Sequence, residues 1–156
     1  MELLIAVSIS IVLSVGLIVL IKPLSLIQKG NDILRKKDLD DAKKAFEQYM
    51  TDTGCYPQPT QICKEGTNVS SCHICTKGQS PQFSYFTRDI CDPKQGSLQY
   101  LYQTEKIGSV VVPCPKWFKI FSILDSAYNA ADDIWGCGKG KCYGYNYVVT
   151  SPGALQ

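Results

Sequence analysis

Eight cysteines are the residues of this chain best suited to chemistry, and all of them lie after the first third of the sequence. They are Cys55, Cys63, Cys72, Cys75, Cys91, Cys114, Cys137 and Cys142. An even number of cysteines in so short a region is typical of a disulfide framework made in an oxidising compartment. We therefore expect disulfides, and we expect Cys137 and Cys142 to close a small hairpin.

Cys72 and Cys75 form a Cys-x-x-Cys motif, which in other settings exchanges electrons or binds zinc. Together with Cys55, Cys63 and His73 it offers enough ligands for a tetrahedral zinc site. The sequence contains no second Cys-x-x-Cys and no βαβ pattern of the thioredoxin kind. Structural disulfides are the favoured interpretation, and zinc binding and redox work remain alternatives.

Other signs of catalysis or of nucleic-acid binding are weak. His73 is the single histidine, and no serine, cysteine or aspartate spacing around it suggests a catalytic triad. A net charge of +2, without interleaved basic and aromatic residues, does not indicate nucleic acid. We expect no enzymatic activity and no cofactor. Asp132 and Asp133 are weak calcium candidates, and a solvated turn is the alternative for this pair.

The elements that position these residues begin with an apolar run, Leu3 to Ile21, which reads LLIAVSISIVLSVGLIVLI. As a helix it is about 28 Å long, enough to cross the hydrocarbon core of a bilayer. We expect residues 1–22 to form the transmembrane half of one long helix. A cleaved secretory signal is the alternative, but a basic segment before the run is lacking. Glu2 suits the positive end of the helix dipole at the membrane interface.

Residues 23–54 are predicted to be the amphipathic half of the same helix. Pro23 should kink or loosen the helix where the apolar run ends, and Gly54 should stop it. The expected polar face carries Arg35, Lys36, Lys37, Asp40, Asp41, Lys43, Lys44 and Glu47. The expected apolar stripe contains Leu39, Ala42, Phe46 and Tyr49, with Ile27, Ile33 and Leu34 upstream. We expect this stripe to pack against the chain's own head; a partner-binding face is the alternative.

Residues 55–156 are predicted to form a disulfide-rich α+β head in which the helix packs on a small antiparallel sheet. Residues 55–82 read as a long loop. Strands are expected at 82–87, 98–104, 109–112 and 143–148, and a short helix or irregular buried segment at 117–124.

Several blocks resemble the type IV pilins and the major pseudopilins of type II secretion systems. ELLIAVSISIVLSVGLIVLIKP resembles the glutamate-led helix of that family, and the stretch from Lys29 to Pro57 resembles the segment that follows it. Near the end of the chain, Asp133-Ile134-Trp135-Gly136, Tyr143-Gly144-Tyr145 and Ser151-Pro152-Gly153 resemble a series in the major pseudopilins. The stretch 58–126 matches no motif of the family.

The resemblance implies a non-enzymatic filament subunit. Such a chain is a single-pass protein of the inner (cytoplasmic) membrane with an extracytoplasmic head. An inner-membrane assembly platform then moves it from the lipid bilayer into a pilus or pseudopilus by self-association through N-terminal helices. The resemblance also implies that Glu2 pairs with a neighbouring subunit's N-terminal amine and that Pro23 bends the helix during assembly. The alternatives are a membrane-anchored extracytoplasmic thiol-redox or zinc-binding module, and a ligand-binding minor pilin.

Three features depart from this expectation. Family precursors carry a basic leader before the glutamate, whereas only Met1 precedes Glu2, so the given sequence starts late or is processed differently. The family's calcium loop extends past Ser-Pro-Gly, whereas this sequence stops at Gln156. Basic residues after the apolar run favour a cytoplasmic head; the cysteines favour an exported one. These basic residues are Lys22, Lys29, Arg35, Lys36 and Lys37.

Overall fold

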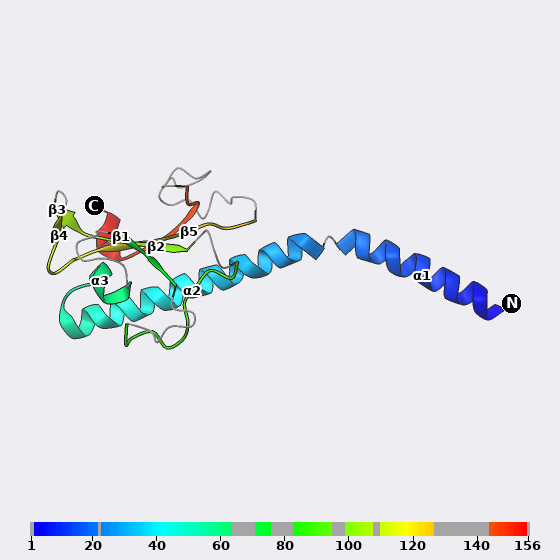
Figure 1. Cartoon of the computed structure of the whole chain (residues 1–156), viewed down its shortest axis with the longest axis horizontal. Coiled ribbons are helices and arrows are strands. Elements are labelled where there is room, and N and C mark those ends of the chain that lie inside the picture. The colour runs from blue at the N-terminus through cyan, green and yellow to red at the C-terminus, as the bar shows by residue number, and fades with distance from the viewer. Residues whose placement is uncertain are drawn as a thin grey trace.

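The chain folds as two successive helices and a small α+β head (Figure 1). The computed structural model describes residues 2–21, 23–63, 71–75, 83–94, 99–107, 110–126 and 144–155, with the backbone alone at 17–21 and 155. The expected α+β class with an antiparallel sheet is confirmed. Among the helices described here, none combines the length and apolar character needed to cross a membrane.

The region predicted to be one long helix is helical throughout its described part. α1 spans Glu2–Ile21 and α2 spans Pro23–Thr53, and residue 22 between them lies outside the described residues. Figure 1 shows α1 leading away from the head at the far end of α2. α2 stops where expected, because Gly54 adopts a positive φ of 77° and its N–H donates to the Met50 carbonyl at 2.8 Å.

Four of the described strands form an antiparallel sheet in the order β1-β2-β5-β6. β2 and β5 lie in the centre, in a register that places Leu101 opposite Phe121. The four strands are β1 (Ser71–Ile74), β2 (Tyr100–Thr104), β5 (Phe118–Ser122) and β6 (Tyr147–Thr150).

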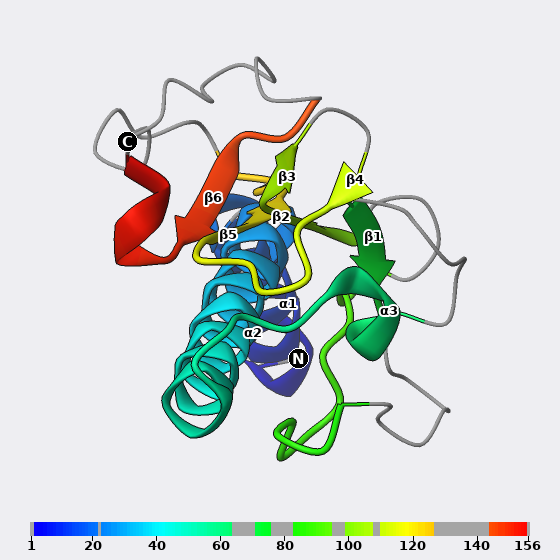
Figure 2. The same cartoon turned by 90° about the vertical axis from the view of Figure 1, so that its left-hand side faces the viewer.

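Short elements surround this sheet. They are α3 (Pro59–Ile62), the separate hairpin of β3 (Lys106–Ile107) and β4 (Val110–Val111), and the 3₁₀ helix η3 (Pro152–Leu155). Figure 2, which looks along the helices, shows the sheet lying to one side of α2 with β1 and β6 at its two edges.

The main core lies between α2 and one face of the sheet. Phe46 of α2 is fully buried, and its ring lies 5.1 to 5.7 Å from those of Phe83, Phe86, Tyr102 and Phe118. The expected packing of the Leu39–Tyr49 stripe on the head is confirmed, since Leu39, Ala42 and Phe46 are buried and Tyr49 packs at the edge of this core. A smaller cluster, Phe121 and Tyr145 with Leu101, Ile123 and Val148, forms separately.

One strand prediction was wrong, and one strand was missed. Residues 83–86 form a turn in which the Phe86 N–H donates to the Phe83 carbonyl, because the two buried phenylalanines are three residues apart rather than two. Residues 118–122 form β5, where a helix or irregular segment was expected.

The other expected strands were placed partly correctly. β2 and β4 fall within the predicted ranges 98–104 and 109–112. The strand expected at 143–148 starts later, as β6, and Gly144 before it has a φ of 87° that an extended strand does not accommodate. β1 and α3 lie in the segment that was expected to be a loop.

The central position of Phe46 leads to a first prediction. Phe46→Ala should lower the free energy of unfolding by about 3–5 kcal/mol, because it leaves a cavity among four rings. Urea unfolding of the full chain in detergent, followed by tryptophan fluorescence, would measure this loss. Ile33→Ala on the exposed side of the same helix is the control and should change little. Equal losses in the two variants would contradict the described packing of α2.

Candidate functional site

The described apolar side chains of α1, from Leu3 to Val15, are exposed on all sides of the helix. Their exposed fractions run from 49% to 75%. Burying each such side chain would stabilise the protein by about 1.5–3 kcal/mol, and a continuous apolar surface of this size marks contact with lipid or protein. The residues are Leu3, Leu4, Ile5, Val7, Ile9, Ile11, Val12, Leu13 and Val15.

The exposed apolar surface continues onto α2, against expectation. Ile33 and Leu34 are 67% and 49% exposed, whereas Asp32 and Arg35 on the opposite side of the same turn are buried. Ile27 is 60% exposed. The prediction that these upstream residues join the packed stripe was therefore wrong. We call α1 together with residues 23–31, which precede the first buried residue of α2, the arm.

The two residues with an expected role in assembly lie at helix starts. Glu2 is exposed in the first turn of α1, where a carboxylate interacts favourably with the helix dipole. Pro23 is the first residue of α2, a position that tolerates proline because the missing N–H has no partner inside the helix. The expected kink at Pro23 stays a prediction, because residue 22 lies outside the described residues.

Three serines of α1 are satisfied within the helix. The hydroxyls of Ser8, Ser10 and Ser14 donate to the carbonyls of Leu4, Ala6 and Ser10 at 2.7 to 2.9 Å. This backbone bonding is what makes serine compatible with an apolar environment. The serines therefore add little polarity to the surface of the arm.

The first buried turn of α2 holds a charge cluster around Arg35, whose side chain is 0% exposed. Its Nε and Nη2 donate to the two carboxylate oxygens of Asp92 at 2.7 and 3.2 Å. Its Nη1 donates to Asp32 at 2.9 Å and to Asp125 at 2.8 Å. Lys94 Nζ donates to the other oxygen of Asp125 at 2.8 Å. We call these five residues the Arg35 cluster.

Asp32 also binds the backbone of the segment that follows β5. Its two oxygens accept the N–H groups of Asp125 and Ser126, each at 2.7 Å. Burial alone would raise the pKa of Asp32 and Asp125, but their hydrogen bonds lower it overall. For Arg35, burial alone would lower the pKa, but hydrogen bonds with Asp92 and Asp125 raise it overall. The cluster therefore favours the charged forms and joins α2 to two distant segments.

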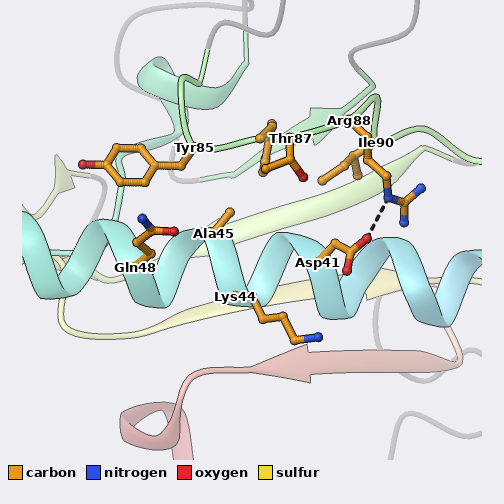
Figure 3. Close-up of a pocket in the computed structure, with 9 residues that line it drawn as sticks. Asp41, Lys44, Ala45, Gln48, Tyr85, Thr87, Arg88 and Ile90 are labelled. Carbon is orange, nitrogen blue, oxygen red and sulfur yellow. Dashed lines mark hydrogen bonds and ion pairs between the residues drawn. The ribbon is translucent and has the colours of Figure 1, made fainter.

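A second charged group lies two turns further along α2 (Figure 3). Arg88 Nε donates to Asp41 at 2.7 Å, and its Nη2 lies 2.7 Å from Asp38 Oδ1, an ion pair outside hydrogen-bond geometry. The Tyr100 hydroxyl donates to Asp38 at 2.8 Å. Burial raises the pKa of Asp38 more than these partners lower it. Arg88 and Asp41 also line a groove of about 240 Å³ between α2 and the segment carrying Tyr85 and Ile90.

The expected disulfides are confirmed for six of the cysteines. The structure links Cys55 with Cys114, Cys63 with Cys72, and Cys75 with Cys91. Cys72 and Cys75 of the Cys-x-x-Cys motif thus bond to different partners and not to each other. Among the described residues, no cysteine is free and no group of His, Cys, Asp or Glu is arranged as a metal site.

Some predictions fall outside the described residues. The hairpin closed by Cys137 and Cys142 lies there, as do the weak calcium candidates Asp132 and Asp133.

Sequence reasoning missed the Arg35 cluster, because Arg35 was placed on the solvent face of α2. One signal was present in the sequence. Asp32, Arg35, Leu39, Ala42 and Phe46 follow helical spacing, so Arg35 continues the buried side rather than the polar one. Its partner carboxylates are 57 and 90 residues away in sequence, and no local pattern predicts them.

The burial of Arg35 leads to a second prediction. At pH 7, Arg35→Met should lower the free energy of unfolding by about 3–5 kcal/mol, since it leaves buried carboxylates without a cation. Folding lowers the pKa values of Asp32 and Asp125. The wild-type cluster therefore stabilises the chain fully at pH values above 3.8, the ordinary pKa of an aspartate. This stabilisation is lost as the pH falls through the lowered pKa values of the folded chain. Urea unfolding should therefore show a smaller difference between the two proteins at pH 3.

Lys44→Met is the matched control. Lys44 lies on the same helix and contacts Asp40 at 2.7 Å, but this ion pair is exposed, so its loss should leave the stability unchanged within error. Two results would contradict the described cluster. One is an equal free energy of unfolding for Arg35→Met and wild type at pH 7, and the other is a difference at pH 3 as large as the one at pH 7.

Comparison of the chain with protein-family models, with curated proteins and with solved structures found no match.

Proposed function

We propose that this chain is a structural subunit of a type II secretion pseudopilus or a type IV pilus-like filament, anchored in the inner membrane before assembly. The observation that carries the proposal is the exposed apolar surface of the arm, which the head does not cover. A surface of this kind needs lipid before assembly and neighbouring helices after it.

The length of the apolar run supports the lipid anchor. The stretch from Leu3 to Ile21 contains no charged residue. A helix of 19 residues is about 28 Å long, close to the thickness of the hydrocarbon core. The serine hydroxyls are bonded internally, so the surface offered to lipid would be almost wholly apolar.

The position of Ile33 and Leu34 supports a protein partner as well. Ile33 lies ten residues after Pro23, about 15 Å further along the helix, which is beyond the hydrocarbon layer when α1 spans it. Lipid would therefore not cover this pair. Gly30, one turn earlier, has open space where a Cβ would lie, so another helix could approach α2 closely there. A second copy of the chain supplies a matching apolar surface.

Glu2 fits the same proposal. A carboxylate inside a bundle of apolar helices is costly unless a positive group pairs with it. The N-terminal amine of a neighbouring copy would be such a group, and this pairing would set the stagger between copies.

The disulfides support a head outside the cytoplasm, since bridges of this kind form and persist in oxidising compartments. Transfer of a lipid-embedded arm into a filament would further require an assembly platform in the same membrane. The proposal therefore includes lipid, other copies of the chain and that platform as partners, and no catalytic step.

A charge-only substitution gives the third prediction. Glu2→Gln, made at the chain's own genomic locus, should abolish filaments that can be sheared from cells, because the uncharged amide no longer orients the neighbouring amine. The chain itself should remain in the membrane with a protease-resistant head. Filaments would be counted by electron microscopy and by immunoblotting of the sheared fraction.

Glu47→Gln is the matched control, since Glu47 is a half-exposed glutamate of α2 that lies 3.8 Å from Lys43. It should assemble normally. Normal filaments from Glu2→Gln would remove the proposed role of Glu2, and a chain recovered only in the soluble fraction would contradict the anchor.

A further inference from the structure

Asp92 connects the Arg35 cluster to a disulfide. It is buried, it follows Cys91 directly, and Cys91 is bonded to Cys75 at the end of β1. Its carboxylate accepts two hydrogen bonds from Arg35 and one from the Lys94 N–H at 2.9 Å. The position of the principal anion of the cluster is therefore fixed by a covalent link to the sheet.

The described disulfides differ in access and in what they hold. Cys63 and Cys72 are buried, whereas both cysteines of the Cys75–Cys91 bridge are half-buried and so within reach of a thiol reagent. The Cys55–Cys114 bridge is also half-buried, but Cys55 follows the far end of α2, which lies about 27 Å along the helix from Arg35. Only Cys75–Cys91, among these three, is both accessible and adjacent to the cluster.

We propose that the Cys75–Cys91 bridge is a redox-sensitive switch that closes and opens the Arg35 cluster on α2. On closing, two thiols lose two protons and two electrons to the disulfide of a thiol–disulfide oxidant, which leaves as a dithiol. A reducing dithiol reverses the step. This proposal concerns the head alone and does not depend on filament formation.

Reduction of the bridge opens the Arg35 cluster because Arg35 is costly to bury without its partners. Without the bridge, the segment of Asp92 and Lys94 is held near α2 by non-covalent contacts alone. These are the packing of the buried Ile90, the ion pairs of Arg88 with α2, and the hydrogen bonds of the cluster itself. When Asp92 leaves, Arg35 loses the carboxylate that accepts two of its hydrogen bonds, so its burial is no longer compensated and water enters.

The hydrogen bonds from Asp125 and Ser126 to Asp32 then loosen, because Asp32 belongs to the same cluster. The first firmly buried part of α2 moves from Asp32 to the turn of Asp38 and Leu39. Reduction therefore lengthens the free arm by about two helical turns. The switch thus sets where on α2 the head ends and the arm begins.

Hydrogen exchange of the full chain in detergent micelles tests the switch. Cys75→Ser with Cys91→Ser should reduce the protection of the Asp125 and Ser126 amides against exchange by roughly 100-fold. This is the effect expected from removing a bridge between cysteines that are 16 residues apart. The amides of the β2–β5 ladder should keep their protection. Cys55→Ser with Cys114→Ser is the matched control and should leave Asp125 and Ser126 unchanged.

Asp92→Asn keeps the experiment informative if the cysteine variant fails to fold. It retains the bridge and removes one charge, so it should reproduce the loss of protection at Asp125 and Ser126. Unchanged protection in Asp92→Asn would overturn the proposal. So would an equal effect of the control bridge, or a loss in the Cys75/Cys91 variant that is spread evenly over the β2–β5 ladder of a folded head.

Discussion

Four aromatic rings surround Phe46 where α2 crosses the sheet, and this contact fixes the orientation of the helix. Rotation of α2 about its axis would bring these rings into water, at a cost of several kcal/mol for each large side chain. The same contact decides which side of α2 stays outward. Ile33 and Leu34 lie on that outward side and are exposed because the core holds the opposite one.

The Arg35 cluster then determines how much of α2 belongs to the head. Buried ion clusters add little net stability, but a missing member is costly, so they hold their geometry strictly. Segments from two distant parts of the chain meet at Arg35, and from this turn onwards α2 is docked. Everything before it is arm. The fold thus separates a packed head from an exposed and largely apolar arm, which is the property that the proposed filament subunit would need.

Local patterns predicted much of this fold. Helical spacing identified the packed residues from Leu39 to Tyr49, and Gly54 marked the end of the helix, because both features depend on neighbours in sequence. The burial of Arg35 depends on carboxylates far away in sequence and was missed. Disulfides were expected, but sequence could not select their pairing. The turn at Phe83 and Phe86 was mistaken for a strand because its aromatic residues suggested strand propensity, whereas the core binds them at a three-residue spacing.

The central claim is that copies of this chain cover one another along the outward side of α2. Photo-crosslinking in living cells from a benzophenone amino acid at position 33 tests it most directly, because Ile33 is exposed and lies beyond the reach of lipid tails. We expect adducts of twice the mass of the chain, and we expect them to disappear in Glu2→Gln. Adducts with lipid alone, or none between copies in cells that make filaments, would contradict the account.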